Sequence, residues 1–128
     1  MIYLLDTHLI LWAAGQPEKL SKTARAIIED ESSGLMFSAA VLWEVTIKAS
    51  LDRDDFVVDP RLLRRGLLEN GYIELPIASD HAVAVVDLPA HHTDPFDRIQ
   101  VAQARVEGLV FLTADPVVAR YGAPVELV

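Results

Sequence analysis

The sequence predicts an α/β domain built on a mainly parallel sheet that helices cover on both faces. Short apolar runs alternate along the chain with stretches of helical periodicity, which is the pattern of repeated β–α–β units. The chain has 128 residues, of which 52% are hydrophobic, so it can bury a real core and is not a disordered chain. We therefore expect a single domain over residues 1–128, without internal repeats or a linker.

The elements follow in order from these patterns. Five short apolar runs predict strands at Ile2–Leu5, Leu35–Phe37, Tyr72–Leu75, Val110–Thr113 and Val125–Leu127. Helical periodicity predicts helices at Thr7–Ala14, Ser21–Glu31, Ala39–Ser50, Pro60–Asn70, Ser79–Val86, Pro95–Glu107 and Pro116–Arg120. The segment Leu51–Phe56 is a predicted charged turn, and Leu88–Thr93 is a predicted loop. Asp94-Pro95 has the form of a helix start, with Asp94 as N-cap.

Composition limits the classes of function. The net charge is −8, which argues against a protein that coats nucleic acid through many phosphate contacts. It does not exclude an enzyme that holds a phosphodiester through metal ions bound by carboxylates, and the alternative is that the chain is acidic simply for solubility. Cysteine is absent, so disulfides and thiolate metal sites are excluded, as is usual in a reducing cytoplasm. With no leader peptide at the N-terminus and no apolar run of about 20 residues, we expect a soluble, cytoplasmic protein that does not enter membranes.

Two acids stand at the carboxyl ends of predicted strands. Asp6 follows the first strand, and Asp115 follows the fourth. Sites in open parallel sheets form at these ends, where the strand order reverses. If the first and fourth strands are neighbours, Asp6 and Asp115 converge. The alternative is that each acid only caps the helix that follows it, and for either acid alone this is the simpler interpretation.

Two further acids lie on predicted helices. Glu44 has mainly apolar neighbours at helical spacing, so its carboxylate needs a cation. One alternative is a structural ion pair with Lys48, four residues later. The other is a metal ion that binds at a functional site. Asp97 lies in the first turn of its helix, where the dipole favours a negative charge. Its functional interpretation is that it faces the sheet end that carries Asp6. Carboxylates brought together need a divalent ion, and oxygen-only ligands favour Mg²⁺ or Mn²⁺ over zinc.

Four segments resemble the PIN-domain nucleases, specifically the VapC-type toxins of bacterial toxin–antitoxin pairs. They are LLDTH (Leu4–His8), SAAVLWEVTIKASL (Ser38–Leu51), LPAHHTDPFDRIQVAQA (Leu88–Ala104) and FLTAD (Phe111–Asp115). The resemblance covers essentially the whole chain. It implies a three-layer α/β/α PIN-like domain with a five-stranded, mainly parallel sheet.

The same resemblance implies a metal-dependent endoribonuclease and assigns its residues. Catalytic and metal-binding roles fall on Asp6, Glu44, Asp97 and Asp115, and Asp94 remains an alternative to Asp97 as the direct ligand. Thr7 and Thr113 match small hydroxyl residues near the site of relatives, and we expect them close to substrate. The implied cofactor is Mg²⁺, with Mn²⁺ as a substitute. The implied partners are the RNA substrate, a VapB-type antitoxin and a second copy of the chain, and the toxin and antitoxin would form a hetero-oligomer.

Other features receive weaker interpretations. Arg98, beside the acids, is a candidate ligand for substrate phosphate. His91 and His92 suggest zinc, but adjacent histidines point to different sides of an extended loop and no further ligand pattern follows. We therefore predict a loop role or a polar contact to substrate for them. Trp12 and Trp43 are predicted packing residues.

Two kinds of rival function are weighed against the nuclease. Phosphatases of the haloacid-dehalogenase type need a second acid two residues after the first, where this chain has His8. Receiver domains need a lysine after a later strand, which the FLTAD segment lacks. The remaining rival is a catalytically silent binding module with the same fold, and metal titration distinguishes it from the nuclease.

Overall fold

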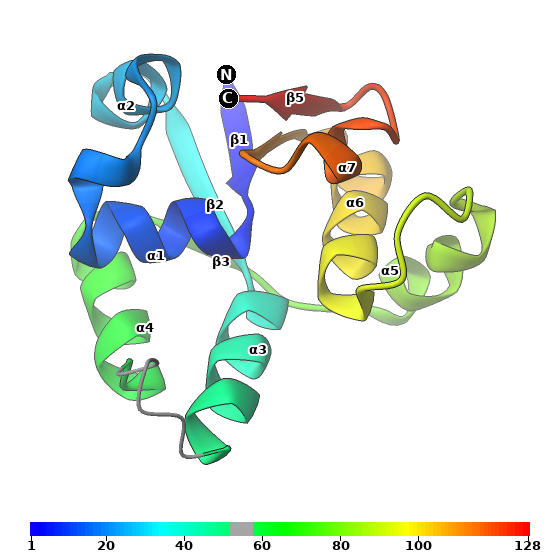
Figure 1. The fold of residues 1–128 in the computed structure, drawn as a ribbon, viewed down its shortest axis with the longest axis horizontal. Helices are drawn as coiled ribbons and strands as arrows, with labels where there is room; N and C mark the ends of the chain where they lie inside the picture. The colour runs from blue at the N-terminus through cyan, green and yellow to red at the C-terminus, as the bar shows by residue number, and fades with distance from the viewer. Residues whose placement is uncertain (52–57) are drawn as a thin grey trace.

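A parallel sheet with β1 (Ile2–Leu5) at its centre organises the structure (Figure 1). The computed structural model describes residues 1–51 and 58–128. The strand order is β3-β2-β1-β4-β5, where β2 is Gly34–Ser38, β3 is Ile73–Leu75, β4 is Val110–Thr113 and β5 is Val125–Leu127. Tyr3 is paired with Leu35 of β2 on one side and with Val110 of β4 on the other. The first and fourth strands are therefore neighbours, which was the condition for Asp6 and Asp115 to converge.

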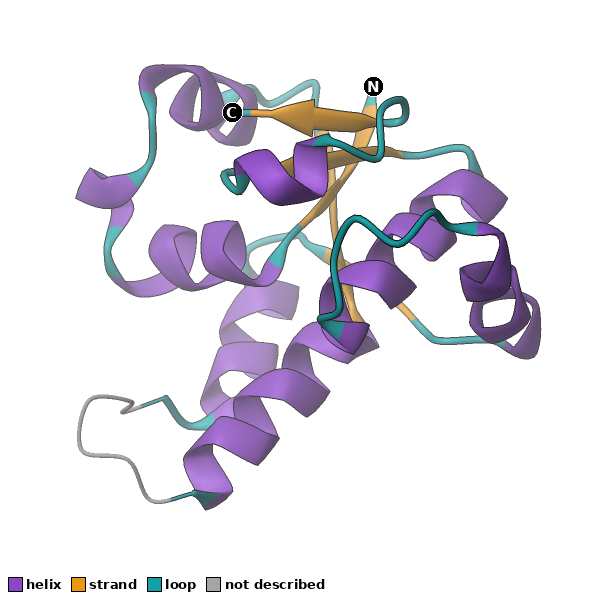
Figure 2. Ribbon diagram, turned by 45° about the vertical axis from the view of Figure 1, so that its right-hand side comes forward, coloured by secondary structure: helices purple, strands orange, loops and turns teal. Residues whose placement is uncertain are grey.

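The alternation of side chains along the strands creates two cores and three layers. Leu4 and Phe111 face one core, which they share with Val101 of α6 (Pro95–Glu107). Their neighbours Leu5 and Leu112 face the opposite core, which is covered by α1, α2, α3 and α4. Both faces are covered because successive strand residues point to opposite sides of a sheet. This is the predicted three-layer α/β/α arrangement, and Figures 1 and 2 show helices on both sides of the strands.

Apart from α5, which begins after Ala78, the described α-helices begin where the sequence offers a polar cap. Those of the first half are α1 (Thr7–Gly15), α2 (Lys22–Glu29), α3 (Ala39–Ser50) and α4 (Pro60–Glu69); those of the second half are α5 (Ser79–Ala84), α6 and α7 (Pro116–Ala119). Side chains of Asp6, Ser21, Ser38, Asp59, Asp94 and Asp115 accept hydrogen bonds from the first turns. Each satisfies backbone N–H groups that have no partner within the helix. Helix α6 ends at Gly108, whose φ of 69° is the left-handed conformation that suits glycine.

Some predicted boundaries and environments are wrong. The helix expected over Ser79–Val86 stops at Ala84, and Val85–Asp87 forms a separate 3-10 turn. Branched valines crowd an α-helix, which favours a change at this point. A second 3-10 turn at Pro17–Lys19 was not expected. The predicted charged turn lies outside the described residues, apart from Leu51. Trp43 is not a packing residue, because 60% of its surface is exposed.

In the described ranges, 1–51 and 58–128, no helix combines the length and apolar character needed to cross a membrane.

Candidate functional site

Asp6 ends the central strand and begins helix α1. Its backbone N–H donates to the carbonyl of Leu112 in β4, so the acid is fixed between two strands. One carboxylate oxygen accepts from the backbone of Leu9 at 2.9 Å, and the other accepts from the hydroxyl of Thr113 at 2.5 Å. Burial raises the pKa of the Asp6 carboxyl above its ordinary value, and these two hydrogen bonds oppose the rise. Asp6 is therefore a helix cap with a second oxygen turned toward β4.

Glu44 reaches the same area from helix α3 and is buried. Its Oε1 accepts from the hydroxyl of Thr7 at 2.7 Å, and its Oε2 is paired with Lys48 Nζ at 3.0 Å. The plain partner predicted for Glu44 is thus present, although the carboxylate also touches the residue next to Asp6. Thr7 ties α1 to α3 and orients one oxygen of Glu44. Thr7 therefore lies beside one of the predicted acids.

Asp97 is the acid most affected by the others. It lies in the first turn of α6, with 20% of its side chain exposed. Burial and the negative charge of neighbouring carboxylates raise the pKa of Asp97 from 3.8 to about 7. These neighbours, in decreasing order of effect, are Asp94, Asp6, Glu44 and Asp115. The carboxylates that the sequence singled out therefore act on one place in the structure.

Asp94 has a different task from Asp97. Its Oδ1 accepts from the backbone N–H groups of Phe96 at 2.8 Å and Asp97 at 3.3 Å, which makes it the N-cap of α6. One oxygen of Asp94 is therefore occupied by the cap of α6, whereas Asp97 lies near several other carboxylates. This difference favours Asp97 over Asp94 as the direct ligand of a cation.

Thr113 joins the two acids that follow neighbouring strands. Its hydroxyl donates to Asp6 and accepts from the backbone N–H of Asp115 at 3.1 Å. Asp115 caps α7 through Val117 and leaves 40% of its side chain exposed. The cap interpretation is thus correct for both acids, and Thr113 links the carboxylate of Asp6 to the backbone of Asp115. Thr113 is fully buried, and its two hydrogen bonds orient the acids that follow β1 and β4.

His92 is a member of this cluster that the sequence analysis did not identify. Its Nε2 lies 3.4 Å from Oδ2 of Asp97 and 3.9 Å from Oδ2 of Asp115. The prediction that the two adjacent histidines point to different sides is confirmed, since the ring of His91 lies against Tyr121 instead. One of the two sides is the acidic cluster. The spacing of His92 from Asp94, two residues apart in a loop that enters a helix, was the available signal.

Arg98 turns away from the acids. Its guanidinium donates to five oxygen acceptors, namely the carbonyls of Val85, Leu88, Pro89 and His92 and the hydroxyl of Tyr121. These bonds hold the loop that precedes α6. Consecutive helical residues point about 100° apart, so the residue after Asp97 need not share its direction. The arrangement favours a structural role for Arg98 over the predicted contact to phosphate.

The donor set fits a divalent cation. Burial, followed by the negative charges of four other carboxylates that come from the end of β1, α3, the start of α6 and the end of β4, raises the pKa of Asp97 to about 7. A cation with two positive charges would relieve the repulsion among these carboxylates. Carboxylate oxygens are the ligands of Mg²⁺ and Mn²⁺. Asp6, Glu44, Asp97 and Asp115 are the residues that could hold such an ion.

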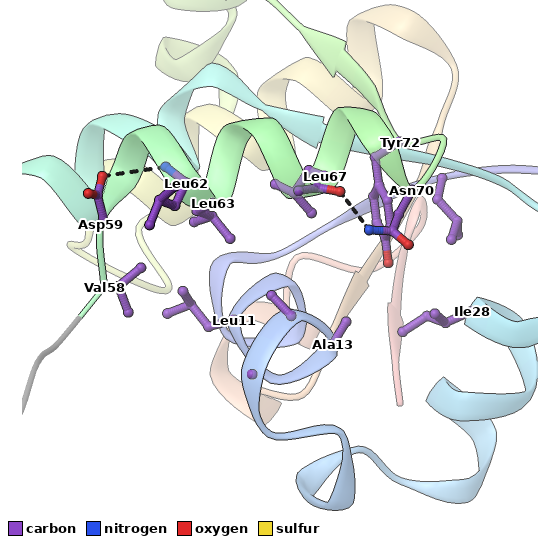
Figure 3. Close-up of a pocket in the computed structure, with 14 residues that line it drawn as sticks. Leu11, Ala13, Ile28, Val58, Asp59, Leu62, Leu63, Leu67, Asn70 and Tyr72 are labelled. Atoms are coloured by element: carbon purple, nitrogen blue, oxygen red, sulfur yellow. Dashed lines mark hydrogen bonds between the residues drawn. The ribbon is translucent and has the colours of Figure 1, made fainter.

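A separate apolar groove is lined by the second half of α1, away from Asp6 at the start of that helix. It has a volume of about 730 Å³ and runs between α1, α2 and α4 (Figure 3). Leu11, Ile28, Leu62, Leu67 and Tyr72 are among its lining residues. Leu62 is 58% exposed, whereas Leu63 and Leu67 on the same helix belong to the core. The apolar residues of α4 therefore divide into a buried set and an exposed set.

Comparisons with known proteins agree with one another. The family model described as the PIN domain matches residues 3–124. No curated protein matches the chain in sequence. Among solved structures, VapBC2 of Rickettsia felis bound to a promoter DNA fragment superposes with a TM-score of 0.69 at 13% identity, over 100% of this chain and 98% of that one.

Two further structures are similar. VapBC-1 of nontypeable Haemophilus influenzae has a TM-score of 0.64 at 16% identity, covering 100% of this chain and 97% of the other. VapC20 of Mycobacterium tuberculosis, described as a sarcin–ricin loop cleaving toxin, has a TM-score of 0.62 at 17% identity, covering 94% and 95%. At these identities the likeness establishes the common fold.

Proposed function

The chain belongs to the PIN domain family, and on that premise we propose that it is a metal-dependent endoribonuclease, the toxin of a VapBC-type toxin–antitoxin pair. One observation carries the proposal. Acids from distant parts of the sequence act together on Asp97, whose pKa they and burial raise to about 7. Such crowding is unfavourable for stability and is typical of groups that work on a bound ion. The ion we propose is Mg²⁺, with Mn²⁺ as a substitute.

Each residue has a task in this proposal. Asp6 and Asp97 hold the ion, Glu44 binds it or orients the attacking water, and Asp115 supports a second ion if two bind. Thr7 and Thr113 keep the carboxylates of Glu44 and Asp6 in place through hydrogen bonds. When bound, the ion supplies Lewis-acid stabilisation of the phosphodiester and lowers the pKa of water. The protein needs no nucleophile of its own, and the products are two RNA ends.

The experiment is cleavage of RNA by the purified protein with Mg²⁺, with Mn²⁺ and with a chelator. We expect activity only with the ions, and its loss in Asp6→Asn and Asp97→Asn. Exposed Asp87 provides the matched control, and Asp87→Asn should cleave like wild type. Cleavage that survives chelation and both substitutions in the cluster would refute the mechanism. Sequencing of RNA ends after brief induction then identifies the target.

The partners belong to the same proposal. Similar folds occur in toxin–antitoxin complexes, and the apolar groove offers an exposed surface that an amphipathic segment of an antitoxin could cover. We further propose a homodimer and action on cytoplasmic RNA. Gel filtration of the chain alone and with the product of the neighbouring gene tests the stoichiometry. Leu62→Asp, in the groove, should release the antitoxin without affecting RNA cleavage.

A further inference from the structure

The loop before α6 delivers one imidazole into the acidic cluster. Nε2 of His92 lies between Asp97 and Asp115, and only 18% of the His92 side chain is exposed. One ligand atom from each of these three residues falls within 4.8 Å of the others. Such a group suggests at first that His92 is itself a metal ligand.

The other ring nitrogen argues against ligation. Nδ1 of His92 accepts a hydrogen bond from the backbone N–H of Asp94 at 2.8 Å. A nitrogen that accepts carries no proton, so the neutral ring must carry its proton on Nε2. The atom that faces the carboxylates is therefore an N–H donor, and its lone pair is not available to a cation.

The backbone around His92 is held on both sides. Arg98 donates to the carbonyls of Pro89 at 2.9 Å and of His92 itself at 3.4 Å, which restrains the loop. Asp94 donates its backbone N–H to the ring and accepts the backbone N–H of Asp97 with its side chain. One residue thus connects the imidazole to the start of the helix that carries Asp97.

We propose that His92 is a positioning residue: its Nε2–H fixes the carboxylates of Asp97 and Asp115 in the orientation that binds the divalent ion. The inference rests on the proposed function. The Nε2 atom lies 3.4 Å from Asp97 and 3.9 Å from Asp115, close enough for its N–H to attract both carboxylates. Donors that face metal ligands from outside the ion orient them, and their loss typically lowers metal affinity 10- to 100-fold. The direction of the change in affinity distinguishes this role from a simpler one. If His92 only occupied the place of the ion, it would compete with the ion, and removing the imidazole would strengthen metal binding.

The test measures Mn²⁺ binding without RNA. Electron paramagnetic resonance titration of the whole chain gives the affinity for wild type, His92→Leu and His92→Gln. We expect His92→Leu to bind Mn²⁺ about 10-fold to 100-fold more weakly. His92→Gln, which keeps an N–H donor of similar reach, should recover most of the affinity. His91→Leu is the matched control in the same loop and should bind like wild type, because that ring packs on Tyr121.

Unchanged or tighter binding by His92→Leu would overturn the inference, as would nitrogen coupling to Mn²⁺ in wild type, which marks a direct ligand. If His92→Leu does not fold, His92→Asn replaces it, since asparagine is too short to reach Asp97, and it should bind more weakly than His92→Gln. RNA cleavage separates the two proposals. Cleavage with normal Mn²⁺ affinity in His92→Leu overturns the positioning role alone, whereas a wild type that binds no ion overturns both.

Discussion

Replacing Asp97 with asparagine should stabilise the ion-free protein while it removes activity. The pKa of Asp97 rises from 3.8 to about 7 on folding, so the folded state binds a proton that the unfolded state has lost. The free energy of unfolding must therefore fall as pH rises from about 4 to about 7. Each pKa unit corresponds to about 1.4 kcal/mol, which gives roughly 4 kcal/mol at pH 7.5. Asp97→Asn avoids this cost because an amide does not ionise.

The assay is thermal unfolding followed by circular dichroism, with chelator present, from pH 3 to pH 8. For a chain of this size, 4 kcal/mol corresponds to a higher unfolding midpoint by on the order of 10 °C near neutral pH. Near pH 3 the wild-type carboxyl is neutral in both states, so the difference should vanish. Mn²⁺ should stabilise wild type and leave Asp97→Asn nearly unchanged, because binding to the folded state raises stability.

The surface variant Asp87→Asn provides the control, since Asp87 is exposed on the 3-10 turn after α5. Its midpoint should follow that of wild type at every pH. A constant difference between Asp97→Asn and wild type across the pH range would refute the reasoning, because a change of packing alone has no pH dependence of this kind.

Three further results are expected. Thr113→Val removes a buried donor to Asp6, so urea unfolding should show a loss of about 1–3 kcal/mol, together with slower RNA cleavage; equal stability would contradict the assigned bond. Arg98→Lys replaces a planar fork by a single point charge, so hydrogen exchange should speed up in residues 88–93 and stay unchanged in α3. Gln100→Met should leave the free energy of unfolding within about 1 kcal/mol of wild type or raise it, because Oε1 of Gln100 is buried without a partner among the described residues; a larger loss in denaturant titration would argue against that environment.

The ends of the strands were predictable from the sequence. The proximity of the acids was predictable only on the condition that the first and fourth strands are neighbours. Apolar runs that stop at Asp6 and Asp115 are local patterns, whereas the pairing of β1 with β4 is a long-range choice that no local pattern encodes. The same limit applies to Glu44. Its apolar neighbours predicted a need for a cation, but the hydroxyl of Thr7 beside it depends on how α1 packs on α3.

Side-chain direction was the feature that the sequence described least well. Arg98 was placed near phosphate because it follows Asp97 in sequence, yet one helical step turns it toward the loop carbonyls. Adjacent histidines diverge, so the two were not expected to bind one ion together. That argument does not prevent one of them, His92, from facing the acids. Trp43 has apolar neighbours in sequence, and its exposure follows from which face of α3 packs on the sheet. The direction of a side chain is set by how its helix packs, and the hydrophobic periodicity of the sequence describes that packing only on average.

The central place of β1 also determines when the acidic cluster can assemble. Residues 2–5 are made first but complete their pairing only with β4, more than a hundred residues later, so the topology has many contacts between distant parts of the chain. Until Thr113 and Asp115 have been synthesised, Asp6 lacks the hydroxyl that orients it and one of its companion acids. A chain that ends before β4 therefore lacks the assembled acidic cluster.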